Sequence, residues 1–125
     1  EEITLLQNYL YLQQKGYGDS LRLSLNVSEY ERQNIFLPPL TLQLLVENAI
    51  KHNVVSKEAV LQVDVHLKEG YIVVQNNINK KLNKEKGTGM GLQNIKSRYA
   101  LLHEKPVLVN DDGNNFIVSL PILKQ

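Results

Sequence analysis

Apolar and polar residues alternate along this chain with two periods, one typical of helices and one typical of strands. Helical spacing predicts a first helix over residues 1–15, which Gly16 and Gly18 would end. A second helix is expected from about Pro39 to about Asn53, because proline suits a first helical turn and no further breaker interrupts the stretch. The chain therefore begins as a mixture of helices and extended segments.

The second helix has an apolar stripe and a polar side. The stripe can pack on a sheet and consists of Leu42, Val46, Ala49 and Ile50. Asn48, Lys51 and His52 fall on the opposite side, with Glu47 beside them. An amide, an ammonium and an imidazole at this spacing could meet an anion and its metal ion. The plainer interpretation is a core helix with a solvated last turn, where Lys and His complement the helix dipole.

Strict alternation of apolar residues, or a run of β-forming residues, marks the extended segments. The expected strands are residues 21–27, 61–67, 71–74, 107–109 and 116–120. Glu69-Gly70 and Asp111-Asp112-Gly113 are hairpin signals between neighbouring strands. A third, amphipathic helix is expected from Gly91 to about Leu102. The pattern predicts an α+β fold, a two-layer α/β sandwich in which three helices cover a mixed sheet of about five strands.

Composition narrows the class of protein without identifying a function. The 125 residues suit one compact domain, and 42% hydrophobic with 22% charged residues is ordinary for a soluble protein. A formal net charge of +1 gives no electrostatic case for nucleic acid as a partner. The absence of cysteine removes disulfides, thiol nucleophiles and thiolate metal sites. Because the first residue is not Met, we expect a fragment of a longer protein.

A glycine-rich stretch supplies the second candidate for chemistry, residues 87–92 with the sequence Gly-Thr-Gly-Met-Gly-Leu. Glycines let backbone N–H groups approach a phosphate, and the helix that follows adds a favourable dipole. The pattern alone is weak: no strand precedes it directly, and no Gly-Lys-Ser/Thr follows. Residues 76–86, before it, lack apolar periodicity and carry four lysines. They are interpreted as a solvated mobile loop, which could also close as a lid over a polyphosphate.

The two stretches, in this order, resemble a known family. LQLLVENAIKHN, residues 42–53, resembles the N box of sensor histidine kinases of the LytS-like class. GTGMGLQNIKSRY, residues 87–99, resembles their second glycine box, and FIVSLP, residues 116–121, their closing strand. The resemblance covers nearly the whole chain. It implies the Bergerat fold of the catalytic ATP-binding domain, which gyrase, MutL and the heat-shock chaperone ATPases share.

The resemblance also implies roles for individual residues. Asn48 corresponds to the asparagine that helps hold Mg²⁺ beside the ATP phosphates, and Lys51 and His52 to positions facing those phosphates. Glu47 corresponds to an acidic position that would polarise the attacking group or merely order water. The remaining implied nucleotide-binding residues are Asn76, Gly87, Thr88, Gly89, Met90, Gly91 and Leu92. Chaperone-type and MutL-type ATPases carry a catalytic acid where this chain has Leu44, which disfavours that alternative.

The chain departs from the family at the adenine end of the site. The family has Asp-Asn-Gly after the second hairpin strand, whereas this chain has Asn76-Asn77-Ile78. The side-chain oxygen of Asn76 can still accept a hydrogen bond from the adenine amino group, but without the charge of a carboxylate. Ile78 in place of glycine would restrict the backbone there.

The resemblance implies a catalytic domain that binds ATP and Mg²⁺ and donates the γ-phosphoryl to a histidine outside the fragment, since His66 and His103 lie in the wrong contexts. Residues 1–16 would end a dimerisation helix, and residues 17–125 would form the ATP-binding domain. Implied partners are the protein's own upstream dimerisation and phosphoacceptor domain, a response regulator and a second copy of the full protein. The domain would be cytoplasmic, tied to a membrane only through absent segments. The alternative is a nucleotide-free regulatory or dimerisation module on the same fold.

Overall fold

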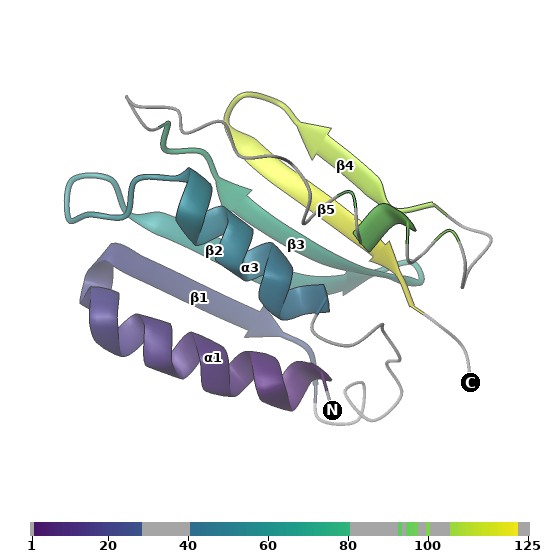
Figure 1. The fold of residues 1–125 in the computed structure, drawn as a ribbon, viewed down its shortest axis with the longest axis horizontal. Coiled ribbons are helices and arrows are strands. Elements are labelled where there is room, and N and C mark those ends of the chain that lie inside the picture. The colour runs from purple at the N-terminus through teal and green to yellow at the C-terminus, as the bar shows by residue number, and fades with distance from the viewer. Residues whose placement is uncertain are drawn as a thin grey trace.

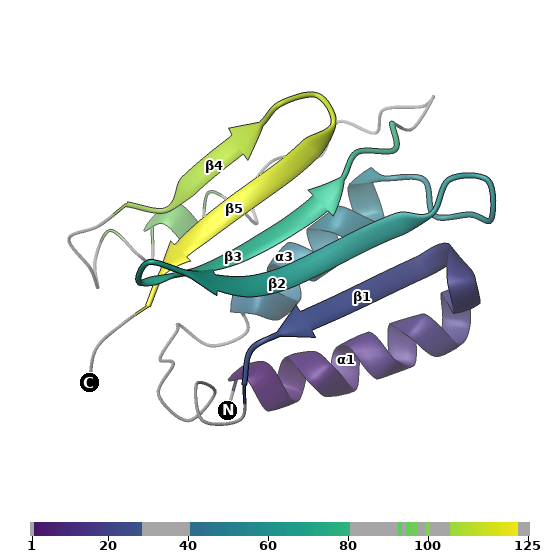
Figure 2. The same cartoon turned by 180° about the vertical axis from the view of Figure 1, so that it is seen from behind.

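A computed structural model of the chain describes residues 2–28, 41–80, 93, 95–97, 100 and 106–122. Five strands form one mixed sheet with the order β1-β2-β3-β5-β4, and the helices lie on one of its faces (Figures 1 and 2). The elements are α1 (Glu2–Tyr17), η1 (Gly18–Ser20), β1 (Leu21–Asn26), α3 (Thr41–His52), β2 (Leu61–Lys68), β3 (Tyr71–Asn77), β4 (Leu108–Asp111) and β5 (Asn115–Pro121). The two-layer α+β fold expected from the sequence is confirmed.

The strands pair as their alternating patterns require. β1 runs parallel to β2, and the remaining neighbours, β2–β3, β3–β5 and β4–β5, are antiparallel. The β2–β3 turn consists of Glu69 and Gly70, whose φ values of 48° and 84° both lie in the left-handed region. Two such residues form the tight turn that matches the twist of a hairpin. The expectation for β3 was too short, because this strand continues beyond residue 74 through Asn77.

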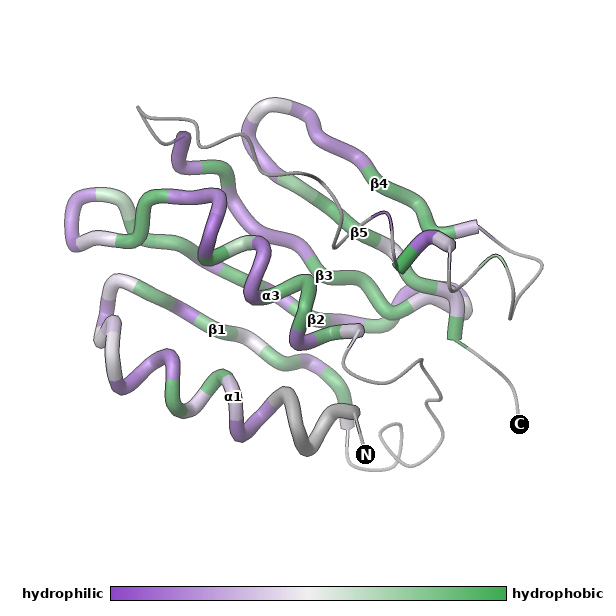
Figure 3. Tube along the Cα trace, in the orientation of Figure 1, coloured by the Kyte–Doolittle hydropathy of each residue, from purple (hydrophilic) through white to green (hydrophobic). Residues whose placement is uncertain are grey.

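The hydrophobic core fills the space between the sheet and the helices. On α3, three residues of the expected apolar stripe, Leu42, Val46 and Ala49, are buried, while the fourth, Ile50, is half-buried against the core. Leu45 is buried with them. On the sheet, every second residue faces these side chains, and Figure 3 shows the resulting alternation of hydrophobic and hydrophilic positions along β1. The opposite face of the sheet carries no helix in the described part of the chain (Figure 2).

Helix α1 packs beside α3 and contributes to the same core. Leu10 is buried in it, and Tyr9 packs against it. Gly16 lies inside the helix, whereas Gly18, with a φ of 60°, lies where the helix gives way to η1. Leu12 on the outer side of α1 is 65% exposed. The proposed domain boundary after residue 16 stays a prediction.

The third expected helix is described only in part. Residues 93, 95–97 and 100 are helical, and Ile95 is buried in the core. This part of the helix lies over β5 on the same side of the sheet as α3 (Figure 1). None of the helices, within the residues described, is long and apolar enough to span a membrane.

Candidate functional site

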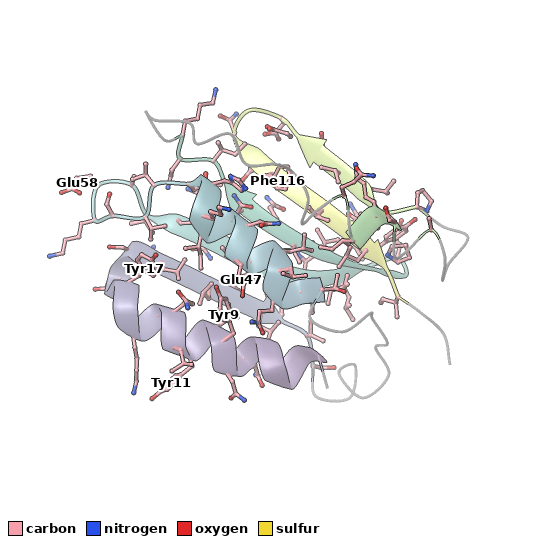
Figure 4. All side chains as sticks on the ribbon, viewed as in Figure 1. Tyr9, Tyr11, Tyr17, Glu47, Glu58 and Phe116 are labelled. Atoms are coloured by element: carbon pink, nitrogen blue, oxygen red, sulfur yellow. The ribbon has the colours of Figure 1, made fainter. Side chains whose placement is uncertain are left out.

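Helix α3 turns neighbouring residues toward two different flanks. Successive residues of an α-helix lie about 100° apart, so Glu47 and Asn48 fall on opposite sides of the ridge farthest from the sheet. Figure 4 shows Glu47 on the flank that faces α1, near Tyr9. Asn48 therefore lies on the other flank, which faces the β3–β5 side of the sheet. The sequence had placed Glu47 beside Asn48 without distinguishing these sides.

The flank of α3 that faces α1 holds a contact between the two helices, in which Tyr9 and Glu47 are both half-buried. The Gln43 side-chain amide donates a hydrogen bond of 3.1 Å to the Glu47 carboxylate, one turn along the helix. Burial raises the pKa of Tyr9, and the negative charges of Glu47 and, when ionised, Tyr17 raise it further. Glu47 is thus engaged between the two helices. Its tentative catalytic role stays a prediction.

The other flank of α3 carries the remaining polar residues of the N box. Asn48 is half-buried, and within the described residues its side chain has no hydrogen-bond partner. Lys51 and His52 are exposed in the last turn of the helix. An unpaired amide beside two exposed basic side chains is suited to an anionic ligand that carries a metal ion.

Asn76 lies inside strand β3, where the sequence had placed it after the strand. It pairs in register with Val63 of β2 and Phe116 of β5, and its side chain points to the helix-covered face with theirs. The side chain is 97% buried, since only 3% of Asn76 is exposed. Its Nδ2 donates to the Asn77 carbonyl at 2.8 Å, which leaves Oδ1 as an acceptor that no described residue uses. This orientation is the one that a donor group of a ligand requires.

The backbone after Asn76 accommodates Ile78 without strain. Among the described non-glycine residues, only Glu69 has a positive φ, so the conformation at Ile78 does not call for glycine. The Ile78 N–H donates to the Asn114 carbonyl at 2.9 Å and so ties this segment to the β4–β5 turn. The backbone restriction that we expected from Ile78 therefore causes no strain, because the chain has an ordinary conformation at this residue.

Sequence reasoning missed a cluster of three asparagines, Asn53, Asn77 and Asn79, which we call the asparagine cluster. Asn77 Oδ1 accepts from the Gln62 N–H at 2.6 Å, and Asn77 Nδ2 donates to the Val60 carbonyl at 2.9 Å. Asn53 Oδ1 accepts from the Asn79 N–H at 2.8 Å. The concentration of asparagines at 76, 77 and 79 was the available signal, because each amide can donate and accept at once.

The rest of the implied site lies outside the described residues. It comprises Gly87, Thr88, Gly89, Met90, Gly91 and Leu92. Over the residues that the structure describes, no group of three or more His, Asp or Glu side chains could hold a metal ion by itself. A metal ion at Asn48 would therefore take its other ligands from phosphate oxygens and water.

Comparisons with known proteins identify relatives of the chain and of its fold. No protein-family model matches the chain. The sensor histidine kinase/phosphatase LytS of Staphylococcus aureus strain MRSA252 is 31% identical in an alignment that covers 100% of the chain and 25% of that protein. The sensor protein LytS of Bacillus cereus is 29% identical over 88% of the chain and 21% of its own length. The chain is LytS-like.

Solved structures show the fold of this LytS-like domain. The catalytic domain of histidine kinase ThkA matches with a TM-score of 0.60 at 15% identity, covering 98% of the chain and 95% of that domain. The Acinetobacter baumannii histidine kinase AdeS matches with a TM-score of 0.53 at 11% identity, covering 97% of the chain and 65% of that structure. The LytS-like domain has the fold of histidine-kinase catalytic domains, while it spans about a quarter of the length of its curated relatives.

Proposed function

We propose that the LytS-like domain binds ATP with Mg²⁺ and donates the γ-phosphoryl to a histidine outside these 125 residues, as the catalytic domain of a sensor histidine kinase. The observation that carries the proposal is a pair of side-chain amide oxygens that no described residue uses, those of Asn76 on β3 and Asn48 on α3. Both lie on the helix-covered side of the sheet and away from α1. Together with the histidine-kinase catalytic fold, they support one site with a base end and a phosphate end.

Asn76 would bind the base. Because the Asn77 carbonyl occupies its Nδ2, the group turned toward a ligand is the acceptor Oδ1. Adenine has an amino group that donates, whereas guanine has a carbonyl oxygen at the corresponding position. A fixed acceptor at this point therefore favours ATP over GTP.

Asn48, Lys51 and His52 would serve the phosphate end. The amide oxygen of Asn48 would join phosphate oxygens and water around Mg²⁺, which polarises the transferred group when bound. Lys51 and the N–H groups of the 87–92 stretch would offset phosphate charge. Phosphoryl transfer breaks the bond between the γ-phosphorus and the bridging oxygen, forms a phosphorus–nitrogen bond on the acceptor histidine, and releases ADP. Positioning and charge neutralisation supply most of the catalysis.

The same proposal covers partners and location. A sensor histidine kinase acts in a two-component system with a response regulator. The other partners proposed are an upstream dimerisation and phosphoacceptor domain and a second copy of the full protein. The exposed Leu12 of α1 is available for contact with the upstream domain. We place the domain in the cytoplasm, attached to a membrane through segments outside this chain.

Calorimetric titration of the chain with Mg-ATP, Mg-GTP and ATP in EDTA tests the proposal. We expect saturable binding of Mg-ATP, weaker binding of Mg-GTP and weaker binding without the metal ion. The alternative is a regulatory or dimerisation module that no longer binds nucleotide, which the replacement of Asp-Asn-Gly by Asn76-Asn77-Ile78 favours. Absence of binding at millimolar Mg-ATP would support that alternative and overturn the proposed function.

A further inference from the structure

The asparagine cluster connects two parts of the candidate site that lie far apart in the sequence. Asn79 Nδ2 donates to the carbonyls of Val54, Ala59 and Val60 at 3.2, 3.1 and 3.0 Å. The Asn79 backbone makes two further hydrogen bonds. Its N–H donates to Asn53 Oδ1, and its carbonyl accepts from the Val54 N–H at 2.9 Å. One residue thus holds both ends of the segment that links α3 to β2.

Asn53 extends this connection into α3. Its Nδ2 donates at 2.8 Å to the carbonyl of Ala49, the residue that follows Asn48. With 7% of its surface exposed, Asn53 is buried, so its side chain exchanges no hydrogen bond freely with water. An unbroken path of hydrogen bonds therefore runs from the last turn of α3 through Asn53 to Asn79, three residues after Asn76.

We propose that Asn79 is a positioning residue for the nucleotide, which fixes the β3 end carrying Asn76 relative to the C-terminal part of α3, where Asn48 directly precedes the anchored Ala49. The inference rests on the proposed function. Asn79 itself touches no reacting atom in this scheme. It acts because a ligand that must contact two protein segments binds more tightly when those segments are already held in place.

The physical basis is the number of groups that Asn79 satisfies at once. Three carbonyls, one amide hydrogen and the Asn77 Nδ2, which donates to Asn79 Oδ1 at 3.3 Å, all converge on it. An alanine at this position would leave the Val54 carbonyl without a donor among the described residues, whereas the Ala59 carbonyl would keep the Ser56 N–H and the Val60 carbonyl would keep Asn77 Nδ2. The 54–60 segment would then be freer to shift. The last turn of α3 and the end of β3 would then be ordered by the ligand, at a cost in affinity.

The test is a double-mutant cycle on the whole chain, with Mg-ATP affinity measured by calorimetry for the parent, Asn48→Ala, Asn79→Ala and the double variant. We expect Asn79→Ala to weaken binding about 5- to 20-fold. Asn48→Ala should weaken the parent by about tenfold or more but the Asn79→Ala protein by only about threefold or less. A smaller effect of Asn48→Ala in the Asn79→Ala protein than in the parent means that Asn79 holds Asn48 in its binding position.

Leu23→Ala is the matched control for lost stability. Leu23 is half-buried on edge strand β1, which β2 separates from β3, and it packs against the core. It should lower the thermal midpoint of the ligand-free chain while leaving Mg-ATP affinity within about twofold of the parent. If Asn79→Ala does not fold, Asn53→Ala takes its place in the cycle, because it removes the Asn53–Asn79 bond together with the bond from Asn53 to the Ala49 carbonyl.

The outcomes separate this inference from the proposed function. The positioning role would be overturned if the two substitutions weakened Mg-ATP binding independently, so that their fold-changes multiplied. It would also be overturned if Asn79→Ala bound Mg-ATP as tightly as the parent. Either result would leave the proposed nucleotide binding intact. A parent chain that does not bind Mg-ATP would overturn both. A deficit in the cycle, with unchanged affinity in Leu23→Ala, establishes Asn79 as a positioning residue.

Discussion

The two flanks of helix α3 differ in how their polar groups are satisfied. On the flank facing α1, Glu47 accepts a hydrogen bond from Gln43 and lies close enough to Tyr9 to raise its pKa. On the opposite flank, Asn48 has no partner within the described residues. Glu47 and Asn48 are adjacent in the sequence, yet Glu47 takes part in the packing of two helices, whereas the Asn48 amide is unpaired among the described residues. The pairing of polar groups therefore separates two neighbours that motif membership treats alike.

The largest expected difference between the flanks is in metal-dependent binding. Asn48→Ala should weaken Mg-ATP binding about 10- to 150-fold, because a hydrogen bond or ligand contact to a charged group contributes about 1.5–3 kcal/mol. The loss should be smaller in EDTA, since the proposed contact is with the metal ion. Glu47→Gln is the control from the other flank and should change affinity less than about threefold. Equal losses for both variants, or equal losses with and without Mg²⁺, would remove the distinction between the flanks.

Substitutions of Asn76 test the proposed base end of the nucleotide site. Asn76→Leu should weaken ATP binding about 5- to 150-fold, because the adenine amino group would be buried without an acceptor at a cost of about 1–3 kcal/mol. The variant should also lose its preference for ATP over GTP. Asn76→Asp keeps an acceptor and should keep both affinity and preference. Titrations of the three proteins with both nucleotides decide this, and equal ATP affinities throughout would reduce Asn76 to a strand residue.

A smaller effect is expected on the flank of α3 that faces α1, in the pKa of Tyr9. Its pKa is raised, so the neutral phenol contributes stability that is fully present below its unfolded value of about 10 and lost as pH rises through the folded pKa. Glu47→Gln should lower this pKa only in part, because burial is the larger cause. Alkaline difference spectra of parent and Glu47→Gln, with Tyr9→Phe to isolate the signal, measure the shift. An unchanged titration would place Glu47 away from α1.

The smallest expected effect is on the pH dependence of stability at Asp112, an exposed residue in the turn between β4 and β5. Asp112 accepts hydrogen bonds from the N–H groups of Asn115 at 2.7 Å and Asn114 at 2.9 Å, in that order of importance, and they lower its pKa. The ionised Asp112 carboxylate therefore stabilises the folded state at pH values above its unfolded pKa, and this stabilisation is lost as pH falls through its folded pKa. Asp112→Asn should flatten the acid-side dependence of the unfolding free energy, measured by urea denaturation below about pH 4. A slope identical to that of the parent would contradict this.

Local periodicity predicted the framework of the domain but not the contacts of its polar residues. The stripe of α3 and the alternation of β1 and β2 are visible in sequence because burial acts on every second or every third to fourth residue. β3 was cut short because Asn76 is polar, although its side chain faces inward. The bonds of Asn79 reach residues 19 to 25 positions away, and no local pattern encodes them. The flank occupied by Glu47 depends on where α1 packs, which the spacing within α3 alone does not determine.

The pairing of β1 has a consequence for the order in which the chain folds. Leu21 pairs with Leu61, 40 positions later (61 − 21), whereas β2–β3 and β4–β5 are hairpins with short turns. Closing a long loop costs more chain entropy before contacts offset it, so hairpins form early and distant parallel pairs form late. We therefore expect β1, and α1 beside it, to join a preformed β2–β3 hairpin last. Amide exchange should then be faster in β1 than in β3, because the segment that folds last is also the first to open.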